Sequence, residues 1–125
     1  MLTPRPTQQI FLATDPVDMR GGFDRLAGRV MQAGLDIYAG HLFVFLSKRR
    51  THLKVLTWDG TGMVVLYKRL ARGVFTRPDV ATDARTATLD AAALAALLDG
   101  LDIPGGQRSQ SAARPRSPLD TRSGA

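Results

Sequence analysis

The chain has 125 residues, a hydrophobic content of 44% and a formal net charge of +6, which fits one basic domain with a modest core. The absence of cysteine excludes disulfides and thiol catalysis and agrees with a reducing compartment. No apolar run approaches the roughly 20 residues of a membrane span, and no secretory leader opens the chain. Of 17 basic residues 14 are Arg, and all 11 acidic residues are Asp, a bias typical of GC-rich bacteria. We expect a cytoplasmic bacterial protein with no membrane partner.

The N-terminal third predicts a strand followed by a helix. Residues 1–9 contain two prolines and form a flexible lead-in, and Ile10–Ala13 suits a first strand. The helix has an apolar face at helical spacing, made of Phe23, Leu26, Ala27, Val30 and Met31. Gly34 is the expected C-terminal cap. The pair Gly21 and Gly22 is unusual in a first helical turn, so either the helix starts later or the backbone approaches a neighbour closely there.

Residues 40–78 predict an antiparallel β-meander, because short apolar runs alternate with turn residues. Asp59–Gly62 has the composition of a tight hairpin turn. The expected strands are Leu42–Ser47, His52–Trp58, Met63–Leu70 and a short Val74–Thr76.

The same stretch holds most of the positive charge. Eight cations against one Asp give it +7, so the rest of the +6 chain sums to −1. Such local basicity is what an anion-binding surface needs. The cations are Lys48, Arg49, Arg50, Lys54, Lys68, Arg69, Arg72 and Arg77.

The C-terminal part predicts one more helix. Asp79–Ala87 reads as irregular, and Thr88 as the N-cap of a helix with an apolar stripe. That stripe is Leu94, Leu97, Leu98 and Leu101. Residues 103–125 lack a core-forming pattern and predict a disordered Arg/Ser/Pro/Gly tail. The expected fold is α+β: one domain over residues 10–102, with a small antiparallel β-meander sheet and two helices packed on one face.

Four blocks of sequence resemble a known family in their order along the chain: DMRGGFDRL (Asp18–Leu26), GHLFVFLSKRR (Gly40–Arg50), LKVLTWDGTG (Leu53–Gly62) and YKRLARGVF (Tyr67–Phe75). They resemble the TnpB-type accessory protein, the Orf2-like product of the second open reading frame in bacterial insertion sequences of family sixty-six. The resemblance covers roughly Ile10–Leu101. Asp15 departs from it, since family members commonly have glycine there, and so does the tail.

This resemblance implies a protein of a mobile element that is required for DNA transposition, a DNA recombination process, beside a separate transposase. DNA binding is the usual supposition for the family, which has no established catalytic residues. The resemblance therefore implies two partners, the DNA of the element ends and the transposase of the same element. A homo-oligomer remains possible.

The residues themselves give little support for catalysis. A metal-dependent nuclease needs paired carboxylates, but the available ones fall in loops, a turn and a helix surface. They are Asp15, Asp18, Asp24 and Asp59. His41 and His52 flank the first hairpin and are expected to face one another, without a further ligand at metal-binding spacing. We expect no enzyme, no cofactor and no metal.

Asp18 and Arg20 have two interpretations. Arg20 is a phosphate clamp beside the glycine backbone, or Asp18 is a helix N-cap paired with Arg20. The structural interpretation is favoured, because Asp-x-Arg is common at helix starts.

The cations of the meander are the expected DNA contacts, since an Arg- and Lys-edged β-ribbon can lie against phosphates. Trp58 and Tyr67 flank the hairpin turn and are expected either to stack on bases or, for Trp58, to join the core. The predicted nucleic-acid-binding residues are Lys48, Arg49, Arg50, Lys54, Lys68, Arg69, Arg72 and Arg20. Arg108, Arg114, Arg116 and Arg122 of the tail add non-specific affinity or nothing.

The alternative is a protein–protein adaptor that docks on the transposase without binding DNA. It predicts that an apolar edge around Phe43, Phe45 and Val65 matters more than charge.

Overall fold

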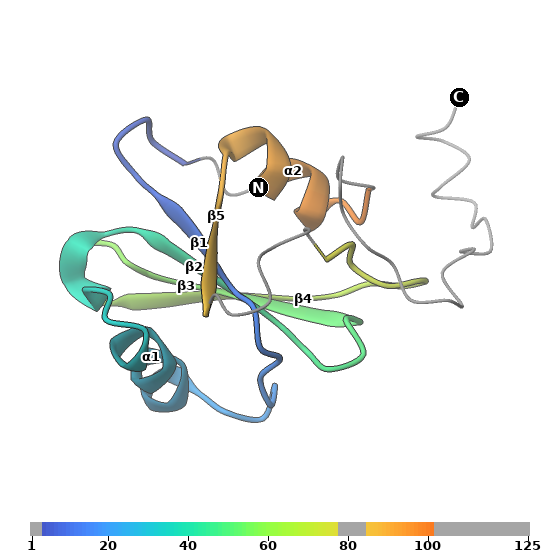
Figure 1. Cartoon of the computed structure of the whole chain (residues 1–125), viewed down its shortest axis with the longest axis horizontal. Coiled ribbons are helices and arrows are strands. Elements are labelled where there is room, and N and C mark those ends of the chain that lie inside the picture. The colour runs from blue at the N-terminus through green and yellow to red at the C-terminus, as the bar shows by residue number, and fades with distance from the viewer. Residues whose placement is uncertain (1–3, 78–84, 102–125) are drawn as a thin grey trace.

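The computed structural model describes residues 4–77 and 85–101 (Figure 1). In this part of the chain, a five-stranded sheet has the order β4-β3-β2-β1-β5. Its strands are β1 (Ile10–Ala13), β2 (Leu42–Leu46), β3 (His52–Trp58), β4 (Met63–Arg69) and β5 (Thr86–Leu89). The helices are α1 (Phe23–Gln32), the short 3-10 helix η1 (Ile37–Ala39) and α2 (Ala91–Leu98). The α+β class is confirmed, and β2, β3 and β4 form the expected antiparallel meander.

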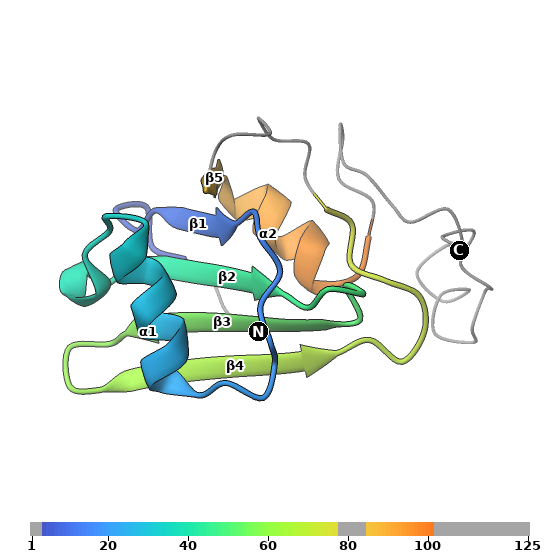
Figure 2. The same cartoon turned by 60° about the horizontal axis from the view of Figure 1, so that its bottom comes forward.

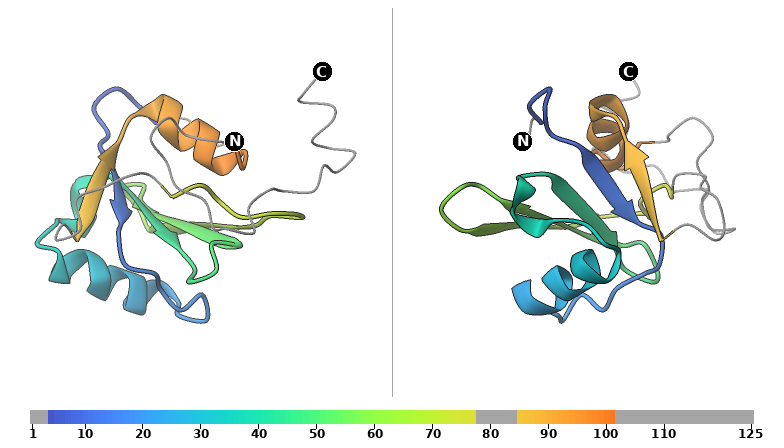
Figure 3. Two further views of the ribbon diagram at one scale, coloured as in Figure 1. Left: turned by 45° about the vertical axis from the view of Figure 1, so that its right-hand side comes forward. Right: turned by 60° about the vertical axis from the view of Figure 1, so that its left-hand side comes forward.

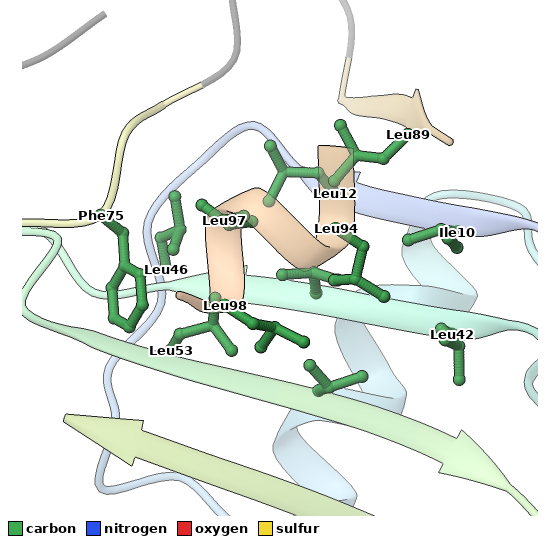
Figure 4. Packing of buried hydrophobic residues seen from close by; sticks show 12 residues of the cluster. Ile10, Leu12, Leu42, Leu46, Leu53, Phe75, Leu89, Leu94, Leu97 and Leu98 are labelled. Carbon is green, nitrogen blue, oxygen red and sulfur yellow. The ribbon is translucent and has the colours of Figure 1, made fainter. Parts of the chain in front are cut away.

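The helices α1 and α2 cover opposite faces of the sheet, so the prediction of two helices on one face is wrong (Figures 2 and 3). The leucines of α2 are buried against one face, together with Ile10, Leu12 and Leu53 (Figure 4). α1 packs over the other face, against Phe43 and Phe45. The physical reason lies in β2, LFVFL, whose five residues are all buried. A strand that is apolar on both sides needs a cover on both sides.

The sheet is mixed and not purely antiparallel, because β1 and β2 run in the same direction with Ile10 opposite Leu42. α1 and η1 carry the chain from the end of β1 back to the start of β2, and parallel neighbours need such a crossover. The carboxyl ends of β1 and β2 therefore lie at the same end of the sheet, next to the β2–β3 turn (Figure 2).

The region before α2 also differs from prediction. Thr86–Leu89 is a strand that pairs antiparallel with β1, where the sequence predicted irregular chain and then an N-cap at Thr88. The N-cap is Asp90, whose carboxylate accepts a 2.7 Å hydrogen bond from Ala93 N. The β-branched residues of TATL favour a strand, and Leu89 joins the core.

The expected short strand at Val74–Thr76 is absent from the described sheet. The segment instead buries Phe75 and Thr76, and Phe75 N donates a 2.7 Å hydrogen bond to Arg50 O. The other predictions for the end of the chain concern residues 79–84 of the irregular segment and the tail, which lie outside the described residues.

Helix α1 confirms the predicted glycine at its C-terminal end. It begins at Phe23 after an N-cap at Gly22, and Gly34 follows its end with φ of +77°. Gly21 is buried, and a Cβ atom there would lie 2.4 Å from Arg25 Cδ. The helix therefore starts after the glycine pair, and the backbone at Gly21 approaches a neighbour closely, so both explanations of the pair hold. Of the predicted apolar face, Leu26 and Val30 are buried, whereas Phe23 and Met31 are at least half exposed.

Lys54 lies in the sheet under the loop that leads into α1. Its side chain is only 8% exposed. The ammonium donates hydrogen bonds of 2.8 Å to Met19 O and 2.9 Å to Gly21 O, and it sits 4.8 Å from the centre of the Tyr67 ring. One charged group thus joins β3, β4 and the 19–21 loop.

Replacing Lys54 with methionine should destabilise the protein. The substitution keeps most of the side-chain volume but leaves two carbonyl oxygens without their donor, which costs about 1–3 kcal/mol. Urea unfolding followed by circular dichroism measures the loss. The matched control is Lys48→Met at an exposed position, where we expect a change within about 0.5 kcal/mol. Equal stability of the two variants would show that the loop does not depend on the ammonium.

Candidate nucleic-acid interface

Six cations gather at one end of the sheet, which we call the basic end. The β2–β3 turn and the segment after β4 lie side by side there, because Leu70 N donates to Thr51 O at 3.0 Å and Phe75 N to Arg50 O at 2.7 Å. β4 reaches the same end, since its last residue pairs with the first residue of β3. The basic end consists of Lys48, Arg49, Arg50, Arg69, Arg72 and Arg77.

The six side chains of the basic end differ in their exposure to solvent. The side chains of Lys48, Arg49, Arg69 and Arg72 are exposed, whereas Arg50 and Arg77 are half-buried. Arg77 is one of the eight cations of residues 40–78, but it is not among the binding residues predicted from sequence. Its proximity to the β2–β3 turn depends on the path of the chain after β4, which no sequence pattern reveals.

Three of the predicted contacts, the two lysines of β3 and β4 and Arg20, do not join the basic end. The ammonium of Lys54 is buried and bonded to main-chain carbonyls. Lys68 points to the α2 side of the sheet, where its Nζ donates to Leu98 O at the end of that helix. A cation at a helix C-terminus interacts favourably with the helix dipole. We therefore leave both lysines out of the proposed contact surface.

Arg20 forms an exposed ion pair with Asp18. Its Nη2 donates to Asp18 Oδ2 at 2.8 Å, and its backbone N donates to Asp18 Oδ1 at 2.9 Å. The hydrogen bonds from the Arg20 side chain and backbone hold the pKa of the Asp18 carboxyl well below its usual range. Asp18 is not the N-cap of α1, because Gly22 occupies that position. The pair instead stabilises the turn before the helix.

The aromatic residues of the meander lie apart. Trp58 is half-buried and packs edge-on against Tyr38, with ring centres 5.2 Å apart. Tyr67 lies opposite Lys54, further along the β3–β4 ladder towards the basic end. It is 54% exposed, and its ring centre is 5.9 Å from that of His52. The expectation that Trp58 and Tyr67 flank one turn is therefore wrong.

No group of three metal-ligating side chains occurs within residues 4–77 and 85–101. His41 precedes β2 and His52 opens β3, so they lie at opposite ends of the hairpin and do not face one another. Asp59 closes the predicted hairpin turn, accepting from Thr61 N and Gly62 N at 2.9 Å each. These hydrogen bonds, that from Thr61 N first, lower the pKa of Asp59. In the described part of the chain, no helix is long and apolar enough to cross a membrane.

A cavity of about 260 Å³ opens at the carboxyl ends of β1 and β2. Three residues of the basic end line it together with the segments that leave the two strands. Its polar lining residues are Thr14, Asp15, Ser47, Lys48, Arg50 and Arg77. This cavity follows from the parallel pairing, which the sequence analysis did not predict.

The comparisons with known proteins give one family model and two similar proteins. Residues 8–108 match the model of the IS66 Orf2-like protein. The uncharacterized protein y4jC of Sinorhizobium fredii is 42% identical over 81 residues, which are 64% of this chain and 69% of that protein. The uncharacterized protein y4hO of the same organism is 37% identical over 103 residues, 82% of this chain and 88% of that protein. No solved structure matches the chain.

The Asp18–Arg20 pair predicts a pH dependence of stability. A carboxyl whose pKa is lowered in the folded state stabilises the protein above its unfolded pKa, and this stabilisation is lost as the pH falls. Below about pH 4, the free energy of unfolding should therefore fall more steeply in the wild type than in Asp18→Asn. Urea unfolding at several pH values measures this. Asp24→Asn, at an exposed carboxyl without a described ion pair, should follow the wild type; coincident Asp18→Asn and wild-type profiles would contradict the prediction.

Proposed function

Because the chain belongs to the IS66 Orf2-like family of insertion-sequence accessory proteins, we propose that it is required for transposition as a non-catalytic protein that binds DNA. The resemblance of the four sequence blocks to this family is confirmed. The proposed contact surface is the basic end, and the proposed partners are the DNA of the element ends and the transposase of the same element.

The observation that supports DNA binding is the convergence of cations from separate segments. Within the described residues, no carboxylate lies within ion-pair distance of Lys48, Arg49, Arg69, Arg72 or Arg77. Exposed Arg and Lys side chains without counter-charges bind phosphates by releasing counterions from DNA. We propose the four exposed members, in the β2–β3 turn and at or after the end of β4, as the contacts to the DNA backbone.

A specific observation favours one alternative, the protein–protein adaptor. β4 is an edge strand of the described sheet and carries the exposed side chains of Val64 and Tyr67. An unpaired edge of this kind can accept a strand from another chain. The edge predicted from sequence cannot serve this role, because Phe43 and Phe45 are each 2% exposed beneath α1.

Neutralising the exposed arginines of the basic end should weaken DNA binding and its salt dependence. For Arg49→Gln/Arg72→Gln, the slope of log K against log salt should decrease in magnitude by about 2, because two phosphate contacts are lost. Fluorescence anisotropy with a duplex of the element's terminal repeat and with a scrambled duplex, each across a salt series, measures both. Arg25→Gln, which removes an exposed arginine of α1, is the matched control and should keep the wild-type slope.

The outcomes separate the hypotheses. Preference for the terminal repeat supports recognition of the element ends, and equal binding supports a non-specific DNA chaperone. Absence of wild-type binding to either duplex at low salt contradicts the DNA-binding proposal. In that case, transposase capture that survives high salt and is lost in Val64→Asp would support the adaptor.

A further inference from the structure

The cavity at the carboxyl ends of β1 and β2 has the position of a ligand site. In open α/β sheets, ligands bind outside the carboxyl ends of the strands, in the crevice between the segments that leave two neighbouring parallel strands. Here those segments are residues 14–16 after β1 and residues 47–50 after β2, and both line the cavity. Arg77 enters the lining from a third segment.

The lining is suited to a small anion. Among the lining residues that the structure describes, Lys48, Arg50 and Arg77 bring three positive charges and Asp15 one negative charge. Arginine has a planar fork of donors that matches the oxygens of a phosphate. Ser47 Oγ accepts a 3.1 Å hydrogen bond from His52 N, which leaves the hydroxyl proton available as a donor. The volume of about 260 Å³ is below that of common small-molecule pockets, so a phosphate group fits better than a whole nucleotide.

The backbone of Arg50 is a second observation at the same place. Arg50 has φ of +59°, and no other non-glycine residue of the described chain has a positive φ. This conformation is unfavourable for a side chain with a Cβ atom and recurs at functional sites. Two hydrogen bonds hold it, from Arg50 N to Ser47 O at 2.9 Å and from Phe75 N to Arg50 O at 2.7 Å. They fix the backbone of Arg50 beside the cavity that this residue lines.

We propose that this cavity is a phosphate-binding site, with Lys48, Arg50 and Arg77 as its cationic ligands. The proposal rests on the proposed function in one respect: on DNA, the group bound is a phosphate of the duplex. That group is either a phosphodiester of the backbone or a phosphomonoester at a strand end. The rest of the basic end contacts the surrounding backbone phosphates.

The first test uses inorganic phosphate and the full chain. In ¹⁵N-labelled protein, phosphate added at constant ionic strength should shift the amide signals of Thr14 and residues 47–51 with saturation. Arg77→Gln and Lys48→Gln should each weaken this binding at least several-fold, while Arg72→Gln, at an exposed arginine outside the lining, should keep the wild-type affinity. Lys48 is exposed, so its variant tests the site even if Arg77→Gln unfolds. Shifts that do not saturate, or equal weakening in all three variants, would overturn the proposal.

The second test separates the two sources of phosphate on DNA. If a 5′-phosphorylated duplex binds more tightly than its 5′-hydroxyl form, and Lys48→Gln and Arg77→Gln abolish the difference, the site holds a strand end. If both duplexes bind equally and these variants lose more affinity than Arg72→Gln, the site holds a backbone phosphate. If all three variants lose equal affinity on both duplexes, the cavity is not the phosphate site although the basic end binds DNA. If the wild-type protein binds inorganic phosphate at this cavity but binds neither duplex, the phosphate site is supported and only the proposed function is refuted.

Discussion

The α1 side of this fold depends on one buried ammonium group, that of Lys54. Removing an ion from water costs several kcal/mol, so a buried lysine persists only with compensating partners. Lys54 has the carbonyl oxygens of Met19 and Gly21 and the face of Tyr67. Because these partners come from the loop before α1 and from the edge strand β4, the contact fixes where the crossover connection meets the sheet.

This contact also joins three of the four sequence blocks. The 19–21 loop belongs to the block DMRGGFDRL, Lys54 to LKVLTWDGTG and Tyr67 to YKRLARGVF. In the fold, the three blocks meet at one ammonium group, and the close approach of Gly21 to Arg25 belongs to the same loop. Three of the four blocks that carry the family resemblance thus take part in one structural contact.

The sequence predicted the elements whose signals are local. The turn at Asp59–Gly62, the apolar strands of the meander and the cap at Gly34 each follow from neighbouring residues, and the structure has all three. The side of the sheet that each helix covers is not local information. LFVFL is apolar on both sides of β2, but no local signal indicates which helix covers which side.

The candidate site, like the fold, is only partly predictable from local sequence signals. A run of basic residues gives the charge of a surface but not the direction of each side chain. Lys48 and Lys54 belong to one charged stretch, yet one is exposed and the other is buried, because strand alternation and the loop above decide the outcome. Arg77 joins Lys48 only through the chain path after β4, which brings Phe75 to Arg50. Long-range pairing of this kind has no signal in the composition or periodicity of either segment.

Charge is distributed unevenly along the strands, so the two ends of the sheet differ. The opposite end of the sheet carries Asp36 and Asp59 beside the Tyr38–Trp58 pair. A charge gradient along the sheet orients a molecule in the field of a polyanion before contact, within a screening length of about 8 Å at physiological salt. In our proposal, the end that turns towards the phosphates is the one where β1 and β2 finish and the cavity opens. Parallel pairing, which creates that opening, and the meander, which supplies the cations, therefore act on the same end of the molecule.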